Sequence, residues 1–361
     1  MFSFLQSNRH LFFVVLSFIF IFSCGGGGST DDIIESPSNL TIEANNVGSS
    51  TSNPNGDGSG TVIFNFSATN AAFYKLNLGN GEIVETSSKM LTYTYTGAGT
   101  NTYNVHISAY NADKFISSTI TVTVMIGLKL VWFDEFDGSG APDSSKWGYD
   151  IGTGSNGWGN GESQYYTNRL ENAKLENGFL IITAKAESYE GSNYTSSRLL
   201  TQGKFYFTYG SVEVRAKLPS GGGTWPAIWM LGANFPTAGW PACGEIDIME
   251  HAGNRQNIVQ SAMHTPSSSG NTENKGSQTL SDVSTEFHVY TVEWSADEMI
   301  FSVDDVVHYI YNPTTKNSDT WPYDKDQFII LNVAMGGSFG GVIDPNFVQS
   351  SMEIDYVRVY Q

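Results

Sequence analysis

Basic residues are scarce in this chain. It has 18 lysines and arginines against 36 aspartates and glutamates, which gives a net charge of −18 over 361 residues. Nucleic acid is disfavoured as a partner, because phosphate binding requires a basic surface. A strongly anionic polymer is disfavoured for the same reason, although a local basic patch could override the average. A neutral ligand suits this composition best.

Cysteine is scarcer still, with only Cys24 and Cys243 in the chain. Residues 1–24 are typical of an export signal, because basic residues precede an apolar run at 11–22 that is short for a membrane span and ends at small residues. A membrane anchor helix is the alternative, but no cluster of charges follows the run. If Cys24 is modified, Cys243 has no partner for an internal disulfide, so the fold must depend on its core.

Residues 21–24, Ile-Phe-Ser-Cys, resemble the lipoprotein box of bacterial lipoproteins. The resemblance implies an exported chain attached to the membrane by a lipid on Cys24. The acidic residues Asp31, Asp32 and Glu35 resemble surface-export signals of such lipoproteins, which implies the outer membrane and its exposed side. Acids in a linker can also do no more than keep it solvated.

The composition divides the region before residue 127 in two. Residues 25–59 are poor in hydrophobic residues and rich in Gly, Ser, Asn and Asp, which is typical of a flexible linker. Residues 60–126 alternate as short strands, with glycine turns at 79–81 and 97–99, and predict a small immunoglobulin-like β-sandwich. Residues 76–81 and 93–100 resemble the polycystic-kidney-disease module, with Leu-Asn and Gly-Asn-Gly where that module usually has Trp-Asp and Gly-Asp-Gly. A spacer is the favoured role and sugar binding the alternative.

Tryptophan is absent up to residue 131, and all eight tryptophans lie after it. We therefore place a domain boundary near Gly127, and residues 127–361 suit one large all-β domain. Apolar and charged residues alternate along 212–218, long helical periodicity is absent, and Gly- or Asn-rich turns separate the runs, so a two-sheet sandwich is predicted. Because pyranose rings stack on aromatic faces, the tryptophans favour a sugar as the neutral ligand.

The segment 244–251, Gly-Glu-Ile-Asp-Ile-Met-Glu-His, places three carboxylates within six residues of otherwise apolar sequence. Carboxylates are costly to bury, so their crowding here suggests a functional site. On a helix the acids would scatter and Ile246 and Ile248 would share no face. On a strand, Glu245 and Asp247 share one face and the isoleucines share the other.

The third acid requires an irregular strand. Glu250 would fall on the isoleucine face of a plain strand unless one extra residue, plausibly Met249, is absorbed as a β-bulge. The bulge would put all three acids on one surface, and His251 would then point away from it. A surface strand with solvated acids is the alternative interpretation.

Two carboxyl groups on one face can hydrolyse a glycosidic bond, one attacking the anomeric carbon and the other protonating the leaving oxygen. A retaining enzyme needs them about 5 to 5.5 Å apart, whereas unbulged Cα atoms four residues apart are separated by about 13 Å. The two side chains must therefore lean together. A carboxyl between them can hydrogen-bond the nucleophile and raise the acid's pKa by like charge, so the three titrate as a coupled set.

The acid segment resembles glycoside hydrolase family 16 in its laminarinase-like form, whose signature is Glu-x-Asp-x-x-Glu. The signature alone is a weak signal, but four further segments agree with the family and follow in its order: GWGNGESQYYT at 157–167, GTWPAIWML at 223–231, LNVAMGG at 331–337 and MEIDYVRVY at 352–360. The match covers roughly residues 128 to 361.

The resemblance implies a concanavalin-like jelly-roll sandwich whose cleft binds a β-glucan chain and cleaves it internally with retention. Glu245 would be the nucleophile, Glu250 the general acid/base and Asp247 the assisting carboxylate. No cofactor is implied for catalysis. A metal site built from the three acids is an alternative, disfavoured because the family uses these acids without metal.

The same resemblance implies residues that contact sugar, namely Trp225, Trp229, Arg198 and His264, and more loosely Asn156, Trp158 and Gln164. Stacking is the favoured role for Trp225, beside three glycines that permit a loop. Singly, each has another interpretation: a tryptophan in the core, an arginine in a surface ion pair, a histidine as a satisfied polar residue. We expect Asn156, Trp158 and Gln164 to close one end of the cleft.

Many family members hold a structural calcium, and the matching positions here are Glu135, Gly178 through its carbonyl, and Asp355. Hard oxygen ligands from both ends of a domain suit calcium, which would hold the termini together without taking part in catalysis.

We expect an exported, lipid-anchored and monomeric endo-β-1,3-glucanase. Hydrolases of mixed-linkage glucan or of marine galactans carry the same signature, although enzymes that cut sulfated galactans usually need basic cleft residues, and few bases lie near these motifs. A non-catalytic glucan-binding protein of the same fold is the alternative from another class, and the intact acid triad argues against it.

Overall fold

A computed structural model describes residues 34–361. The predicted signal and lipidation site at Cys24, and the acids Asp31 and Asp32, lie outside the described residues. Within the described part of the chain, no helix is long and apolar enough to span a membrane.

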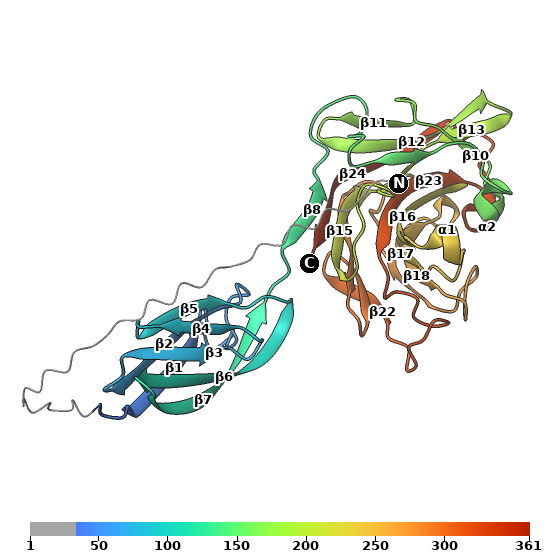
Figure 1. The fold of residues 1–361 in the computed structure, drawn as a ribbon. Helices are drawn as coiled ribbons and strands as arrows, with labels where there is room; N and C mark the ends of the chain where they lie inside the picture. The colour runs from blue at the N-terminus through green and yellow to red at the C-terminus, as the bar shows by residue number, and fades with distance from the viewer. Residues whose placement is uncertain (1–33) are drawn as a thin grey trace, which may run out of the picture. The chain divides into compact units, whose positions relative to one another are not determined.

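The chain divides into two compact units, the larger of which contains residues 123–361 with segments 45–62 and 92–102. Before residue 127 the chain forms two small sheets (Figure 1), one of three strands in the order β1-β2-β5 and one of four in the order β4-β3-β6-β7. Their strands are β1 Ser38–Asn46, β2 Thr61–Thr69, β3 Phe73–Asn77, β4 Ile83–Thr86, β5 Met90–Thr94, β6 Gly99–Asn111 and β7 Lys114–Ile126.

Strand β1 corrects the predicted linker. Residues 25–59 were expected to be flexible throughout, but residues 38–46 pair with β2. The half-buried side chains Leu40, Ile42 and Ala44 alternate with exposed ones. This period-two pattern is a strand signal that the polar average composition of the segment conceals.

The larger unit is built on two large sheets (Figure 1). The first follows the order β10-β13-β12-β24-β15-β20-β21-β22, with β11 beside β12 and β8 beside β24. Its strands are β8 Leu130–Asp134, β10 Gln164–Tyr166, β11 Ala173–Glu176, β12 Phe179–Tyr189, β13 Ser192–Ser196, β15 Gly210–Lys217, β20 His288–Trp294, β21 Met299–Val303, β22 Val306–Tyr311 and β24 Gln349–Tyr360.

The second sheet has seven strands in the order β19-β18-β17-β16-β23-β14-β9. Its strands are β9 Gly148–Asp150, β14 Arg198–Leu200, β16 Thr224–Gly232, β17 Glu245–His251, β18 Ile258–His264, β19 Lys275–Thr279 and β23 Gln327–Met335. Helical segments are short: η1 Gly157–Gly161, α1 Phe235–Ala238, η2 Gly253–Arg255 and α2 Gly337–Gly340.

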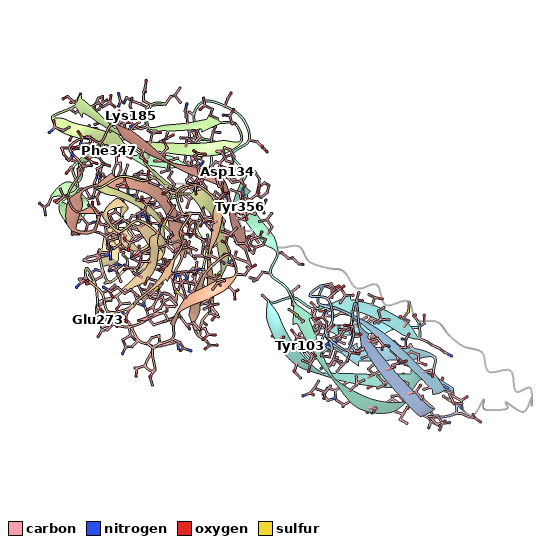
Figure 2. All side chains as sticks on the ribbon, turned by 180° about the vertical axis from the view of Figure 1, so that it is seen from behind. Tyr103, Asp134, Lys185, Glu273, Phe347 and Tyr356 are labelled. Atoms are coloured by element: carbon pink, nitrogen blue, oxygen red, sulfur yellow. The ribbon has the colours of Figure 1, made fainter. Side chains whose placement is uncertain are left out.

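One hydrophobic core joins the two large sheets. Val214 and Val357 of the first sheet and Ile228, Ile246 and Leu331 of the second belong to the same buried cluster. Figure 2 shows side chains filling the interior of this unit. The all-β sandwich is therefore confirmed, and the face of the seven-stranded sheet that turns away from this core is left to form a site.

Candidate active site

Strand β17 carries the acid segment, and its pairing confirms a β-bulge. Opposite β18, Asp247 pairs with Ala262 and Glu250 with Gln260, so two residues on β17 face one on β18. On the β16 side Met249 pairs with Ile228 and Asp247 with Trp229, which leaves Ile248 as the extra residue. The prediction of Met249 for this role is thus wrong by one position, because the register is set by both neighbouring strands.

A hydroxyl holds the bulge in place. Ser261 of β18 donates a hydrogen bond from Oγ to the carbonyl of Ile248 at 2.7 Å. Ile248 and Met249 both point into the core, so Glu250 turns to the same face as Glu245 and Asp247. His251 is fully buried and lies outside the cleft, as expected from a bulge that ends at Glu250.

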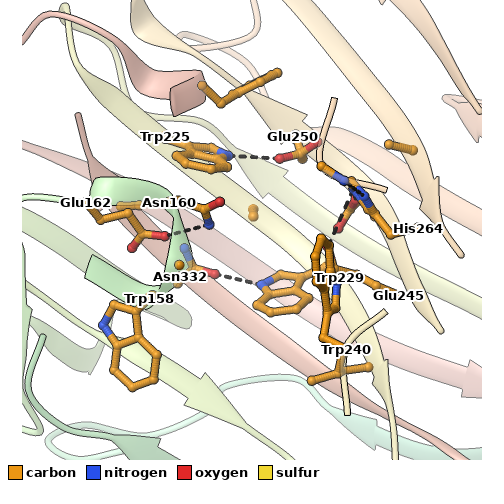
Figure 3. Close-up of a pocket in the computed structure, with 18 of the residues that line it drawn as sticks. Trp158, Asn160, Glu162, Trp225, Trp229, Trp240, Glu245, Glu250, His264 and Asn332 are labelled. Carbon is orange, nitrogen blue, oxygen red and sulfur yellow. Dashed lines mark hydrogen bonds and ion pairs between the residues drawn. The ribbon is translucent and has the colours of Figure 1, made fainter. Parts of the chain in front are cut away.

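The three carboxylates line a cleft of about 1360 Å³ on the exposed face of the seven-stranded sheet. Figure 3 shows Glu245 and Glu250 in this cleft with indole rings around them. Cross-strand pairing explains the arrangement, since partners in register point to the same face. One such row runs through Trp229, Asp247, Ala262 and Lys275.

Burial sets the electrostatics of the acids. The pKa of Glu245, Asp247 and Glu250 is raised to about 8 each, by burial above all and, for the two glutamates, also by repulsion from neighbouring carboxylates. His264 acts in the opposite direction on both glutamates. The group therefore retains protons at neutral pH, which a general acid requires.

Two indoles hold the two glutamates. Trp225 donates from Nε1 to Glu250 Oε1 at 3.0 Å, and Trp240 donates from Nε1 to Glu245 Oε2 at 3.1 Å. Gln260 Nε2 lies at 3.5 Å from the other oxygen of Glu250. Each glutamate thus has one carboxylate oxygen held by an indole N–H. Hydrogen bonds of this kind favour the ionised form of the carboxyl group.

His264 lies beside the acids in a defined tautomer. Its Nδ1 accepts the backbone N–H of Gly270 at 3.1 Å, so the ring proton sits on Nε2. Nε2 lies 3.0 Å from Asp247 Oδ2 and 3.5 Å from Glu245 Oε1. The donor atoms of Glu245, Asp247 and His264 all lie within 4.8 Å of one another, as a metal site would need. However, with its ring proton on Nε2 the imidazole turns no lone pair towards the carboxylates, and a metal ligand requires one.

The cleft wall on the β14 side is aromatic. The guanidinium of Arg198 lies 4.7 Å from the ring centres of both Trp158 and Trp229, and its Nε lies 3.0 Å from Asp150 Oδ2. Trp229 also donates from Nε1 to Asn332 Oδ1 at 2.7 Å. Of the predicted sugar contacts, Arg198, Trp158, Trp229 and Asn156 line the cleft. Arg198 is at once a cleft residue and an ion-pair partner.

Of two further predicted sugar contacts, one needs correction. Trp225 was expected to stack on sugar beside three glycines that permit a loop; it lies in strand β16, lines the cleft with 9% of its surface exposed and donates its indole N–H to Glu250, and stacking by its ring stays a prediction. Gln164 is fully buried and lies outside the cleft, where it donates to Glu162 at 2.6 Å and accepts the backbone N–H of Met335 at 2.7 Å. Strand pairing determines to which side of β10 the Gln164 side chain points, and the glycine-rich motif does not reveal that pairing.

Several cleft residues were not predicted from the sequence. They include Trp240, Glu162, Asn332, Gln260, Arg255 and Lys275. Glu162 accepts hydrogen bonds from Gln164, Asn160 and Tyr166. The Tyr166 hydroxyl in turn accepts one from Asn332 Nδ2. Trp240 could have been suspected, because it precedes Glu245 by only five residues.

The predicted calcium ligands do not present a free donor set. Both carboxylate oxygens of Glu135 accept hydrogen bonds from Arg358 at 2.8 Å. Asp355 Oδ2 accepts one from Arg215 at 2.5 Å. Since an arginine already neutralises each carboxylate, these residues do not fit a calcium ion as arranged.

Comparison with known proteins assigns the fold and site to a family. Residues 158–358 match the profile described as Glycosyl hydrolases family 16. The chain belongs to glycosyl hydrolase family 16. A curated member, the "Beta-glucanase" of Rhodothermus marinus, is 47% identical over 246 residues, which cover 64% of this chain and 85% of the relative.

Solved structures of family 16 agree. The laminarinase of Flavobacterium sp. UMI-01 is 47% identical with a TM-score of 0.61, covering 64% of this chain and 100% of its own. SCLam, a non-specific endo-β-1,3(4)-glucanase crystallised with a glucan oligosaccharide at its active site, is 43% identical with a TM-score of 0.62, covering 65% of this chain and 95% of its own. The stretch matched to the family contains all three carboxylates and both indole donors.

Proposed function

We propose that this chain is a retaining endo-β-1,3-glucanase. The observation that carries the proposal is the placement of Glu245, Asp247 and Glu250 by a bulged strand on one face of a cleft, with each glutamate held by an indole N–H. Similarity to enzymes named β-glucanase and laminarinase supports the β-glucan substrate and the 1,3 linkage.

The cleft geometry accommodates double displacement. The three coupled carboxyls share protons, and in the reactive arrangement Glu245 is the ionised member and Glu250 a protonated one. Glu245, held by the Trp240 N–H, attacks the anomeric carbon while Glu250 donates its proton to the leaving oxygen. Glu250 then removes a proton from water, which displaces Glu245 from the sugar. Asp247, beside the Nε2–H of His264, is placed to share protons with Glu245 as its charge is consumed.

The experiment is a reducing-sugar assay on laminarin, mixed-linkage β-glucan and agarose. We expect product from laminarin. Product from mixed-linkage glucan as well would indicate a non-specific endo-β-1,3(4)-glucanase, the second candidate, which similarity to SCLam favours. Cleavage of agarose alone would replace the proposal with a galactanase, and retained binding without product would identify a glucan-binding protein.

A matched pair of variants tests the acid assignment. Glu245→Ser removes the nucleophile from the cleft and should abolish turnover, while glucan binding is kept and the thermal midpoint does not fall. Glu353→Ser removes an acid of β24 in the other sheet and serves as the control, with turnover retained. Hydrolysis by Glu245→Ser at near the original rate would show that the nucleophile has been assigned wrongly.

We also propose that the chain is exported and anchored through Cys24, with residues 60–126 as a spacer of the polycystic-kidney-disease type and a monomeric catalytic domain. The support is the lipoprotein-box-like sequence at 21–24. Cys24→Ala should move the activity from the membrane fraction to the soluble fraction of expressing bacteria, and the released protein should elute as a monomer in size-exclusion chromatography. Unchanged membrane association would exclude this anchor.

A further inference from the structure

A histidine from the other sheet reaches the bulge of β17. His308 lies on β22, at one edge of the first sheet. Its Nε2 lies 2.9 Å from Oγ of Ser261, which belongs to β18 of the seven-stranded sheet. Ser261 is fully buried, and its Oγ donates at 2.7 Å to the carbonyl of Ile248, the extra residue of the bulge. Groups from three strands and both sheets thus form one chain of hydrogen bonds.

The number of protons fixes the direction of these hydrogen bonds. A serine hydroxyl has one proton, and that of Ser261 goes to the Ile248 carbonyl, which can only accept. Ser261 Oγ therefore accepts from His308, and the ring proton of His308 lies on Nε2. Burial lowers the pKa of His308, so the imidazole is uncharged at neutral pH and this is its one N–H. Nδ1 is buried and has no hydrogen-bond partner within residues 34–361.

A glycine allows the two sheets to approach each other here. Gly276 of β19 pairs with Ser261, so both residues face the same side of the seven-stranded sheet. A Cβ atom on Gly276 would lie 2.8 Å from the carbonyl oxygen of His308 and 2.5 Å from Cβ of Tyr309. Any side chain at this position would push β22 away from β18. The glycine therefore brings the imidazole within reach of the Ser261 hydroxyl.

These hydrogen bonds end where β17 turns Glu250 into the cleft. Ala262, the next residue of β18, lines the cleft, whereas Ser261 is fully buried and holds the bulge from the side away from the cleft. Without the His308 donor, the Ser261 hydroxyl has one partner fewer and is free to rotate. Ile248 lies two residues before Glu250, so a loosely held bulge moves this carboxyl relative to the N–H of Trp225 and to the bound sugar.

We propose that His308 is a positioning residue for the general acid/base Glu250, which it affects through Ser261 and the bulge of β17. His308 lies outside the cleft and acts without touching the substrate. This inference rests on the proposed function, because that function gives Glu250 its role. It assigns a catalytic consequence to a contact between the two sheets on the far side of β17 from the sugar.

The test measures kcat and KM of His308 and Ser261 variants on laminarin at neutral pH. The side chain of His308→Asn is too short to replace Nε2, so we expect kcat to fall about fivefold with KM within about twofold, as for the loss of one neutral hydrogen bond. His308→Gln should recover part of the loss, because its amide N–H reaches about the position of Nε2. A kcat that is unchanged in His308→Asn overturns the inference.

The double variant Ser261→Ala/His308→Asn shows whether the effect passes through the hydroxyl. If it does, the double variant has the kcat of Ser261→Ala, because the hydroxyl is already absent and nothing remains for His308 to orient. A second fall of about fivefold in the double variant, as large as the fall that one lost hydrogen bond causes in the wild type, overturns the inference.

His288→Asn is the matched control. His288 is a buried histidine of β20 in the same sheet as His308, and its ring nitrogens lie 2.7 Å from Asp304 Oδ2 and 3.2 Å from Asp282 Oδ1. Its replacement should lower the thermal midpoint and leave kcat unchanged. An equal fall of kcat in His288→Asn and His308→Asn would reduce the effect to a general loss of stability and overturn the inference.

Failure of the proposed function would look different, because the wild type would then release no product from laminarin. NMR decides the inference without turnover. Nitrogen spectra of the histidine-labelled wild type should show His308 with its proton on Nε2, and the carbon signal of the Glu250 carboxyl should move in His308→Asn but not in His288→Asn. A proton on Nδ1 of His308, or a Glu250 signal that His308→Asn leaves in place, overturns the inference.

Discussion

At the residue scale, the site depends on three carboxyl groups that are buried together. Burial raises their pKa to about 8 each, so the folded protein holds protons that the unfolded chain releases above an ordinary carboxyl pKa of about 4. The stability that these three groups contribute is then fully present at low pH and is lost as the pH rises towards 8, because the native state binds more protons than the unfolded state. The catalytic group is thus maintained at a cost in stability.

Glu250→Gln should therefore stabilise the protein at alkaline pH. The amide cannot ionise and can still accept the Trp225 N–H, so we expect a thermal midpoint at pH 8.5 that exceeds the wild-type value by at least about 4 °C, at about 2–4 °C per kcal/mol. The difference should vanish near pH 4. Glu286→Gln, on an exposed position, is the control. Calorimetric scans that show equal midpoints at both pH values would contradict the buried-acid interpretation.

The two indole donors should have separable effects on the pH profile of kcat/KM. Each N–H stabilises an ionised carboxylate, so its loss raises the pKa of that carboxyl. Trp240→Phe should move the acidic limb, which reports ionised Glu245, upwards by roughly half a unit to one unit. Trp225→Phe should move the alkaline limb, which reports protonated Glu250, by a similar amount. A shift of the same limb in both variants would mean that the two roles are wrongly assigned.

At the element scale, the bulge in β17 determines where Glu250 points. The need to place three acids on one face predicted a strand with one extra residue, and this is confirmed. The identity of that residue could not be predicted, because it depends on the register of β16 and β18 together. Lys275 was missed for a similar reason, because it comes from a strand whose proximity to the acids is created by pairing between distant segments. Trp240, in contrast, lies only five residues before Glu245 and could have been suspected.

Predictions from local composition were also wrong at two places in the chain. The glycine-rich segment at 157–167 correctly indicated a cleft loop with Asn156 and Trp158, but Gln164 belongs to β10 and faces inwards. The polar segment before residue 60 concealed β1. In each case the side that a residue faces is fixed by a neighbouring strand, and average composition contains no such information.

Ser261→Ala tests whether the bulge is held by the hydroxyl of Ser261. Loss of its hydrogen bond to the Ile248 carbonyl leaves a buried acceptor unpaired, so the free energy of unfolding should fall by about 1–3 kcal/mol. We also expect kcat to fall more than KM rises, because Glu250 is displaced. Ser351→Ala removes a hydrogen bond to Thr183 in the other sheet and should cost stability without lowering kcat. Equal kcat values for both variants would separate the bulge from catalysis.

At the scale of the whole molecule, the core and the cleft both lie within residues 127–361. Every residue of the large core cluster and every residue of the cleft comes from this part of the chain. The two small sheets of residues 38–126 pair only among themselves. From the distribution of tryptophan, the sequence predicts a domain boundary near Gly127, whereas the larger compact unit contains residues 45–62 and 92–102 as well as 123–361.

A chain of residues 127–361 should therefore fold and act by itself. We expect its kcat/KM on soluble laminarin to lie within about twofold of the value for residues 34–361, as for an independent domain. Circular dichroism and the same reducing-sugar assay check folding and activity. A shortened chain that folds but loses most activity would show that the N-terminal sheets contribute to the cleft.

The central claim is that Glu245 and Glu250 perform double displacement on a β-1,3-glucan. Proton NMR of the reducing ends released from laminarin, recorded before mutarotation, tests it most directly. Retention predicts that the β-anomer forms first and then equilibrates with the α-anomer. First appearance of the α-anomer, or no product from laminarin, would contradict the account.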